Sequence, residues 1–463
     1  MERYLDASVS SSALASFLNR LERTGTQAHC LEVFENGRRL IRWNVDPYRC
    51  DDKRQLYSLS KSFTSTALGA AYDRGLLKPE DKVLSFFPEY APLCQQEEGW
   101  QRMELRHVMT MADGHAACVM PKMAFAQDGV QAFFETPLAY EPGTTFVYNT
   151  GGTCLLAEVV RRVTGMPAPQ WLAQTVFEPL GIDAFTWESC ADGHCEGGTG
   201  LYLSCDDVAK LGLLYLNEGQ WNGRQVLSRD WVQMATGKQK DNVRNGSPDW
   251  TAGYGFQFWR NCREGYRGDG AFGQVCAVLP QRRMVVALLA ESTDMPQEFE
   301  ALWSFVEQMK MPGNSAVPRT AYEPEGTLHG CRMDTGWRAL QENPAGLLAL
   351  RVQADEAGTS VDFCDANGVQ RLTASSGQWR ENHLYLRNFF PNLHTLMPRS
   401  QRQLLHLSAA AHAFPGGVAL ECRMRNAPHA FAMQATLHHG KLQLELHSPL
   451  DVFGAEKRLL EAE

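Results

Sequence analysis

The fold is decided by one stretch, YSLSKSFT at residues 57–64, which continues into STALGAA at residues 65–71. Ser58 and Lys61 lie three positions apart, so on a helix they share one face. A serine hydroxyl needs a neighbouring base to act as a nucleophile, and the positive end of a helix favours the oxyanion charge that develops. Small residues at 65–71 let such a helix pack deep in a core. The stretch therefore predicts a buried helix whose first turn carries a serine nucleophile.

The spacing of Ser58 and Lys61 is not specific by itself, because Ser-x-x-Lys tetrads arise by chance. The alternative is a capped helix with a lysine on its surface. The surrounding sequence decides between the two, because further distinctive stretches follow in order. They are GLLKPED at 75–81, FFPE at 86–89, LRHVMTM at 105–111, Gly114-His115, PGTTFVYNTG at 142–151 and GAFGQ at 270–274.

With these stretches in this order, the chain resembles the β-lactamase-related serine hydrolases, which include class C β-lactamases, DD-peptidases, esterases and amide hydrolases. The resemblance covers about residues 28–310. It implies an α/β (α+β) fold of the serine β-lactamase-like transpeptidase type: an antiparallel sheet flanked by helices, with a helical subdomain. It also implies that Tyr148, in the second motif, handles protons together with Lys61. A loop aromatic packed under a turn is the alternative for Tyr148.

Local patterns agree independently with that fold. Asn36-Gly37 lies between two apolar runs and supplies the positive φ angles of a hairpin turn. Residues 274–279 and 284–290 predict two further strands, and apolar spacing from Phe299 to Val306 predicts an amphipathic helix. Ser204 with Asp207 predicts a capping box at another helix. A sheet begun by the hairpin is thus completed after a largely helical insertion.

Beyond about residue 320 the pattern changes to alternation, as at 348–352 and 442–446. Alternating apolar and polar residues are typical of strands with one buried face. The sequence therefore predicts two domains, a hydrolase domain at 1–315 and an antiparallel β domain at 316–463. The second domain is expected to be a barrel or a sandwich.

The resemblance implies the remaining site residues except His115 and Tyr202, which are expected to contact substrate because of their positions along the sequence. The oxyanion hole is expected to consist of the backbone N–H groups of Ser58 and Ala271. The residues expected to contact substrate are Asn149 and Thr150 in the second motif, Gly268 and Gly270 in the third, His115 in a turn near the cleft, and Tyr202 before the capped helix. For His115 the alternative is a loop histidine hydrogen-bonded to backbone.

Two departures from the family pattern bear on the substrate. Thr150 stands where the family often has Asn, and Gly268 stands where it has the Lys or His that helps to hold a substrate carboxylate. Alternation places Arg267 and Asp269 on the face opposite Gly268, where we expect a structural pair. We therefore predict a hydrolase that forms an acyl-enzyme at Ser58 with an ester or amide of a small, uncharged acyl group. Weak or no β-lactamase activity is expected.

Two alternatives stay open. A transacylase would use the same three residues with an alcohol or amine in place of water. A catalytically silent, penicillin-binding-like binding or sensing module would leave the C-terminal β domain as the functional part. The presence together of Ser58, Lys61 and Tyr148 argues against the silent module.

Composition excludes other classes of function. A formal charge of −9 and a pI near 5.8 lack the basic surface that nucleic-acid binding needs. No apolar stretch approaches the roughly 18 residues that span a bilayer, and no secretory signal is recognised. Thirteen cysteines without a paired framework predict reduced thiols and a cytoplasmic protein. We expect a small-molecule acyl substrate and neither a metal nor a cofactor, while the oligomeric state is not predicted.

Overall fold

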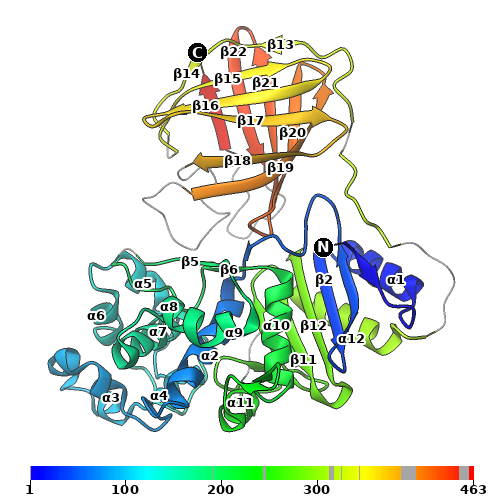
Figure 1. The fold of residues 1–463 in the computed structure, drawn as a ribbon. Coiled ribbons are helices and arrows are strands. Elements are labelled where there is room, and N and C mark those ends of the chain that lie inside the picture. The colour runs from blue at the N-terminus through cyan, green and yellow to red at the C-terminus, as the bar shows by residue number, and fades with distance from the viewer. Residues whose placement is uncertain are drawn as a thin grey trace. The chain divides into compact units, whose positions relative to one another are not determined.

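The structure is a computed structural model, and it describes residues 2–190, 192–242, 247–311, 318–324, 326–343, 345–386, 403–447 and 458–462. It divides into two compact units (Figure 1). The N-terminal unit comprises Met1–Asn44 and Cys50–Pro318, and the C-terminal unit comprises Val45–Arg49 and Arg319–Glu463. The predicted boundary after residue 315 lies outside the described residues.

Within the described part of the N-terminal unit, seven strands form an antiparallel sheet in the order β1-β3-β2-β12-β11-β10-β9. The strands are β1 (Tyr4–Leu5), β2 (Thr26–Glu35), β3 (Arg38–Asn44), β9 (Trp259–Arg260), β10 (Tyr266–Gly270), β11 (Gln274–Leu279) and β12 (Met284–Ser292). At the hairpin between β2 and β3, Asn36 and Gly37 have φ angles of 51° and 75°, as a type I′ turn requires. The pairing of β2 with β12 confirms that the N-terminal hairpin begins a sheet completed by distant strands.

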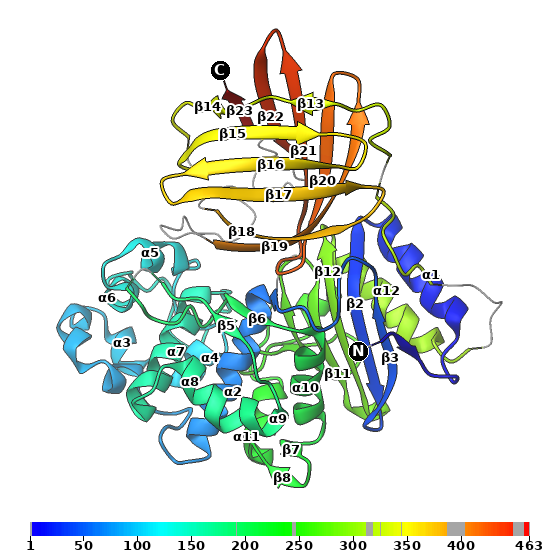
Figure 2. The ribbon, with the colours of Figure 1, turned by 45° about the horizontal axis from the view of Figure 1, so that its top comes forward.

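Helices cover both faces of this sheet (Figures 1 and 2). On one face α1 (Ser11–Arg23) and α12 (Met295–Gln308) lie together, and Phe17 stacks on Phe305 with ring centroids 4.6 Å apart. On the other face α10 (Cys205–Leu216) packs on β11 and β12. The predicted capping box of Ser204 and Asp207 opens α10.

A largely helical region is inserted between β3 and β9. Its helices are α2 (Ser60–Tyr72), α3 (Glu98–Arg102), α4 (Leu105–Met109), α5 (Met120–Phe125), α6 (Gly129–Phe134), α7 (Thr150–Thr164), α8 (Ala168–Leu172), α9 (Glu178–Leu180) and α11 (Arg229–Thr236). Its short strands are β4 (Arg54–Gln55), β5 (Thr186–Trp187), β6 (Leu201–Leu203), β7 (Gln220–Trp221) and β8 (Arg224–Gln225). Because α2 contacts both α7 and β10, it lies where the helical region meets the sheet.

In the C-terminal unit, eleven strands of the described chain form one sheet. They are β13 (Met333–Asp334), β14 (Arg338–Ala339), β15 (Leu347–Ala354), β16 (Gly358–Asp365), β17 (Gly368–Ser376), β18 (Arg380–Leu386), β19 (Gln403–Phe414), β20 (Gly417–Met424), β21 (Ala430–His438), β22 (Lys441–His447) and β23 (Arg458–Ala462). The sheet curls until Leu340, next to β14, bridges Ala462 of β23. This contact favours the barrel of the two predicted forms.

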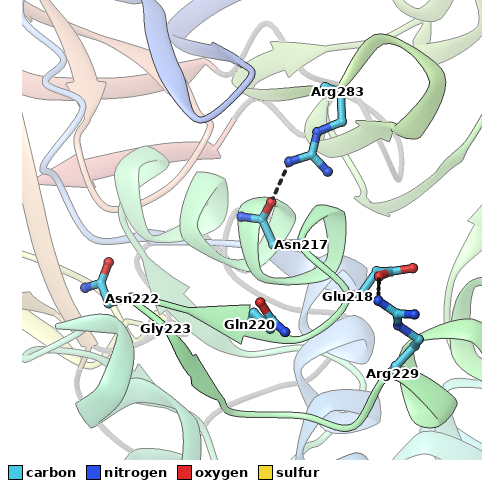
Figure 3. A pocket seen from close by; sticks show the side chains of 7 residues that line it. All are labelled: Asn217, Glu218, Gln220, Asn222, Gly223, Arg229 and Arg283. Carbon is cyan, nitrogen blue, oxygen red and sulfur yellow. Dashed lines mark hydrogen bonds and ion pairs between the residues drawn. The ribbon is translucent and has the colours of Figure 1, made fainter.

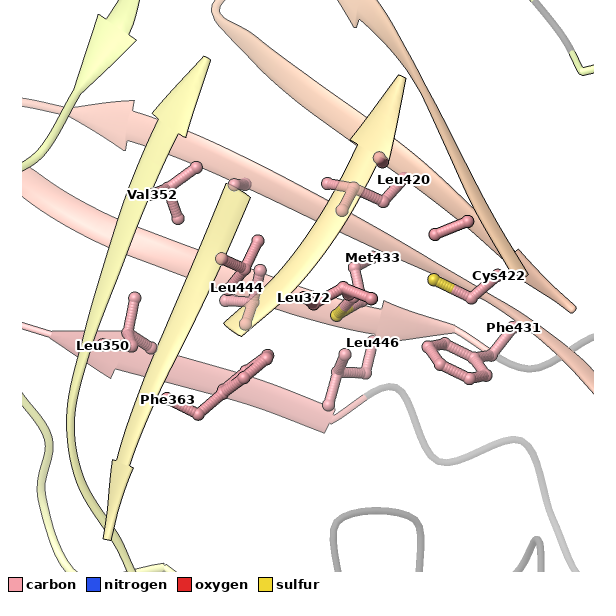
Figure 4. Close-up of a cluster of buried hydrophobic side chains, with 14 of the residues drawn as sticks. Leu350, Val352, Phe363, Leu372, Leu420, Cys422, Phe431, Met433, Leu444 and Leu446 are labelled. Carbon is pink, nitrogen blue, oxygen red and sulfur yellow. The ribbon is translucent and has the colours of Figure 1, made fainter. Parts of the chain in front are cut away.

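The interior of the C-terminal unit is apolar (Figure 4). Leu350 and Val352 of β15 meet side chains from β16, β20, β21 and β22, among them Phe363 and Leu444. Along β18 and β22, the alternation predicted from sequence therefore directs every second residue inward. None of the helices in the described chain is long and apolar enough to cross a membrane.

Candidate active site

Ser58 lies in the 3₁₀ turn η1 (Tyr57–Leu59), directly before α2 begins at Ser60. The preceding Tyr57 has a φ of 49°, a left-handed conformation that costs a non-glycine residue about 1–3 kcal/mol. The Tyr57 ring packs edge-on against Phe272, with centroids 5.0 Å apart. Residues 60–71 of α2 are buried, so Ser58 is held at the start of a buried helix, as predicted.

Lys61 connects the parts of the site. Its Nζ donates to Ser58 Oγ at 3.1 Å, to Thr150 Oγ1 at 3.0 Å and to the Gly198 carbonyl oxygen at 2.7 Å. Lys61 is 1% exposed, so the alternative of a surface lysine is wrong. The Gly198 carbonyl can only accept, whereas both hydroxyls can accept or donate. A neutral Lys61 amine can therefore keep its bond to Gly198 while it takes a proton from Ser58.

Tyr148 approaches Lys61 from the loop before α7. Lys61 Nζ lies 4.9 Å from the centroid of the Tyr148 ring. The same ring stacks on Trp259 of β9, with centroids 5.4 Å apart and an interplanar angle of 17°. The structure thus brings Ser58 and Tyr148, from two separate stretches of backbone, next to the amine of Lys61.

Asn149 and His115, two residues expected to contact substrate, are both hydrogen-bonded within the fold. Asn149 caps α7: its Oδ1 accepts from the N–H groups of Val119 and Gly151, both at 3.0 Å, and its Nδ2 donates to Asp113 Oδ2 at 2.9 Å. His115 Nδ1 lies 3.0 Å from Asp113 Oδ1. Both residues are 0% exposed. These bonds hold the start of α7, and the expected contacts of Asn149 and His115 with substrate stay predictions.

Thr150 and the glycines of the third motif make contacts within the fold, while their expected contact with substrate stays a prediction. Thr150 holds Lys61 through its hydroxyl. A Cβ at Gly268 would lie 2.4 Å from Leu59 Cδ1, and one at Gly270 would lie 2.0 Å from the Leu56 carbonyl oxygen. Both glycines are buried and let β10 pack directly on η1. A Lys or His at position 268 would not fit unless the side chain of Leu59 moved, because its Cβ would collide with that side chain.

Arg267 and Asp269 form the structural pair that the alternation predicts. Arg267 Nε donates to Asp269 Oδ2 at 2.9 Å, and Arg267 is 0% exposed. Its remaining donors bind the Asp249 carbonyl oxygen at 3.0 Å and Asn261 Oδ1 at 3.2 Å. The Arg267 guanidinium is bonded within the fold, so it does not replace the missing Lys or His that would bind a substrate carboxylate.

The turn that carries Ala271 lies against two side chains, Gln274 and Glu298, whose roles the sequence did not predict. Gln274 Nε2 donates to the carbonyl oxygens of Phe272 and Ala290, both at 2.8 Å. Beneath the turn, Glu298 Oε2 would lie 2.6 Å from a Cβ at Gly273. Burial raises the pKa of Glu298 to about 8, so its carboxyl is neutral at pH 7. A signal was present for Glu298, because it falls on the apolar face of α12.

The loop before β6 contributes backbone carbonyl groups to the site, and the residue types in that loop do not predict this contribution. The carbonyl oxygen of Gly197 accepts from Thr64 Oγ1 at 2.7 Å, next to the Gly198 carbonyl that binds Lys61. A Cβ at Gly198 would lie 2.6 Å from Thr150 Cγ2, so only glycine fits. Tyr202, four residues on, donates to Glu188 Oε1 at 2.8 Å. Its expected contact with substrate stays a prediction.

A polar pocket of about 340 Å³ shares none of these residues (Figure 3). It is lined by Asn217, Glu218, Gln220, Asn222, Gly223, Arg229 and Arg283. Arg283 donates to Asn217 Oδ1 at 3.0 Å, and Arg229 pairs with Glu218. Because its cations are used within the pocket wall, we assign the pocket no part in the reaction.

Comparison with known proteins is consistent with this geometry. The family model described as Beta-lactamase matches residues 19–308. The 6-aminohexanoate-dimer hydrolase of Paenarthrobacter ureafaciens is 26% identical over 310 residues, which cover 61% of this chain and 77% of that protein.

Solved structures share the fold. A putative 6-aminohexanoate-dimer hydrolase from Bacillus anthracis superposes with a TM-score of 0.55 at 18% identity, covering 67% of this chain and 87% of that one. A structure described as a hydrolase with promiscuous acyltransferase activity gives a TM-score of 0.52 at 15% identity, covering 63% of this chain and 98% of that one.

Proposed function

The chain belongs to the Beta-lactamase family and is a serine hydrolase, and from this premise we propose that it forms an acyl-enzyme at Ser58. The observation that carries the proposal is the 3.1 Å distance between Lys61 Nζ and Ser58 Oγ. Lys61 is also buried, so its side chain is shielded from solvent. Lys61 and Tyr148 are the proposed proton-handling groups.

In the acylation step, Ser58 Oγ attacks the substrate carbonyl carbon and its proton passes to the neutral amine of Lys61. The carbonyl oxygen becomes an oxyanion, which the backbone N–H groups of Ser58 and Ala271 would stabilise. Contact of Gly270 with the Leu56 and Leu59 backbone supports this pairing, because it brings the Ala271 turn against η1. Collapse of the tetrahedral intermediate expels the alcohol or amine, which takes a proton from Tyr148 or Lys61.

Deacylation is proposed to reuse the same groups. A water molecule takes the place of the leaving group, gives its proton to Tyr148 or Lys61 and attacks the acyl carbon. The bond between the acyl carbon and Ser58 Oγ then breaks, and Ser58 regains its proton. The amine of Lys61 can serve in both directions because its bond to the Gly198 carbonyl is kept throughout.

The proposed substrate is an ester or amide of a small, uncharged acyl group. Gly268 offers no cation for a substrate carboxylate, and Arg267 is occupied inside the fold. These two facts support weak or no turnover of β-lactams and D-alanyl peptides, both of which carry a free carboxylate. The Paenarthrobacter relative is named a 6-aminohexanoate-dimer hydrolase, and a dimer of an amino acid is compatible with amide cleavage.

Transacylation is the second candidate, since a structural neighbour is described as having promiscuous acyltransferase activity. The acyl-enzyme would then be resolved by an alcohol or amine. Product analysis with and without an added alcohol distinguishes the two outcomes, because only a transacylase yields the new ester as its main product.

The test of the proposal is turnover of a neutral short-chain aryl ester and the matching anilide, compared with a β-lactam and a D-alanyl dipeptide. We expect Ser58→Ala and Lys61→Ala each to lower kcat/KM by at least about a thousandfold. Ser85→Ala and Lys78→Ala, at exposed positions of the same unit, are the matched controls. Preference for the carboxylate-bearing substrates would contradict the substrate class, and full activity of Ser58→Ala would contradict the nucleophile.

We also propose that the protein works in the cytoplasm. All thirteen cysteines lie in the described part of the chain, and each is a free thiol. This is the state that a reducing compartment maintains.

A further inference from the structure

Two histidines and a glutamate converge on one face of the C-terminal sheet. Strands β18 and β19 pair antiparallel, and their register sets His383 directly opposite His406. Glu381 precedes His383 by two positions, so both side chains leave β18 on the same side. Cross-strand and diagonal neighbours of this kind lie within reach of long side chains.

The donor atoms lie at distances close to those of a metal site. Glu381 Oε1 is 2.8 Å from His406 Nε2 and 3.8 Å from His383 Nε2. The two imidazole rings stack with centroids 4.3 Å apart, and one donor atom from each residue lies within 4.8 Å of the others. Tetrahedral ligands with bonds of 2.0–2.1 Å lie about 3.3 Å apart. Small side-chain rotations would therefore bring all three atoms into one coordination sphere.

The surroundings suit an ion that enters from solvent. Glu381 and His383 are exposed and His406 is half-buried. Arg425 Nη1 binds Glu381 Oε2 at 3.0 Å, which orients the carboxylate and leaves Oε1 toward the histidines. The His406 N–H donates to Asn426 Oδ1 at 3.2 Å, so the backbone behind the third ligand is also fixed.

We propose that Glu381, His383 and His406 bind a divalent transition-metal ion, with Zn²⁺ as the best match. Two imidazole nitrogens and one carboxylate oxygen form the mixed donor set that Zn²⁺ accepts, with water completing the coordination. Mg²⁺ and Ca²⁺ prefer all-oxygen sites and are excluded by the two histidines. The ion would cross-link β18 to β19 in the C-terminal unit, independently of the reaction at Ser58.

The test uses the full chain without an affinity tag, treated with a chelator and then titrated calorimetrically with ZnCl₂. We expect saturable binding of one Zn²⁺ per chain, and more than about a tenfold loss of affinity in His383→Ala, His406→Ala and Glu381→Gln. His329→Ala, which removes an exposed histidine of the same unit, is the control and should bind like the wild type.

Two results would overturn the site: no saturable binding of ZnCl₂, or unchanged stoichiometry and affinity in His383→Ala and Glu381→Gln. Should His406→Ala fail to fold, Glu381→Gln preserves the shape of the side chain and keeps the test decisive. Visible absorption bands of bound Co²⁺ give a second measurement. These bands should appear with the wild type and be lost in Glu381→Gln and His383→Ala, and bands that persist in both variants would also contradict the proposal.

Discussion

At the scale of single residues, proton transfer depends on what surrounds Lys61. The amine has one partner that can only accept, the Gly198 carbonyl, and two hydroxyls that can reverse their role, those of Ser58 and Thr150. We therefore propose that Thr150 is a positioning residue, which keeps Lys61 Nζ next to Ser58 Oγ.

Thr150→Val removes that partner while it preserves the shape of the side chain. The Lys61 amine becomes an ammonium as it takes the Ser58 proton, so the hydrogen bond to Thr150 is then one to a charged group. Losing such a bond costs about 1.5–3 kcal/mol, so kcat/KM should fall about ten- to a hundredfold. Thr145→Val, in the same loop, is the control. Steady-state kinetics with a neutral ester measure the effect. An unchanged rate in Thr150→Val would show that Thr150 does not position Lys61.

Glu298 makes stability depend on pH. Its folded pKa of about 8 is above the ordinary value of 4.5, with burial as the main cause and the charges of Asp269 and Arg267 acting in opposite directions. Unfolding therefore releases a proton between about pH 4.5 and pH 8, and the folded state loses stability as the pH rises through this window. A glutamine side chain at this position would carry no such proton.

We therefore expect the Tm of Glu298→Gln, relative to the wild type, to rise steadily from pH 5 to pH 8. Thermal unfolding at several pH values measures this difference. Glu300→Gln, at an exposed position of the same helix, is the matched control. A difference in Tm that is independent of pH would mean that the Glu298 carboxyl already ionises in the folded protein at low pH.

At the scale of elements, short sequence signals correctly predicted the turns and helix starts that depend only on neighbouring residues. Asn36-Gly37 gave the hairpin and Ser204 with Asp207 gave the start of α10, because each signal acts within four residues. The ring of Tyr148 next to Lys61 was expected from the resemblance alone. The Gly198 carbonyl could not be predicted, since every residue has a carbonyl and this one comes from 137 positions away. The inward turn of Asn149 depends likewise on Asp113, a tertiary neighbour.

The contact between β10 and η1 gives an element-scale prediction. A methyl group at Gly270 would meet the Leu56 carbonyl oxygen, which is backbone and cannot move aside, whereas one at Gly268 would meet the side chains of Leu59 and Ser62. Gly270→Ala should therefore displace η1 and cost about a hundredfold in kcat, in line with a shift of about 1 Å at the nucleophile. Gly268→Ala should be milder, and Leu59→Ala should partly restore it.

Kinetics and urea unfolding of the single and double variants measure these effects. Full activity of Gly270→Ala would contradict the close packing of β10 on the nucleophile turn. Equal damage in both glycine variants, without rescue by Leu59→Ala, would contradict the distinction between backbone and side-chain contact.

At the scale of the whole molecule, the C-terminal unit is built from two separate segments of the chain. Val45–Arg49, between β3 and η1, belongs to that unit. Asp46 exchanges backbone hydrogen bonds of 2.9 Å with Thr320 and Tyr322, and the buried Tyr48 packs edge-on against Tyr322 with centroids 6.3 Å apart. A chain ended at residue 318 loses all of these partners.

We therefore expect Tyr48→Ser to lower the Tm of the full chain clearly and that of the 1–318 chain little, because only the full chain holds the partners of Tyr48. Differential scanning fluorimetry on the four proteins measures this. Equal losses in both backgrounds would show that Tyr48 is stabilised from within the N-terminal unit.

The central claim, a nucleophile at Ser58, is tested most directly by mass spectrometry of the full chain after reaction with a fluorophosphonate. The account predicts one adduct per chain, located by peptide mapping at Ser58 and absent from Ser58→Ala, with slower labelling in Thr150→Val. An adduct on another residue of the native chain, or labelling that persists in Ser58→Ala, would contradict it.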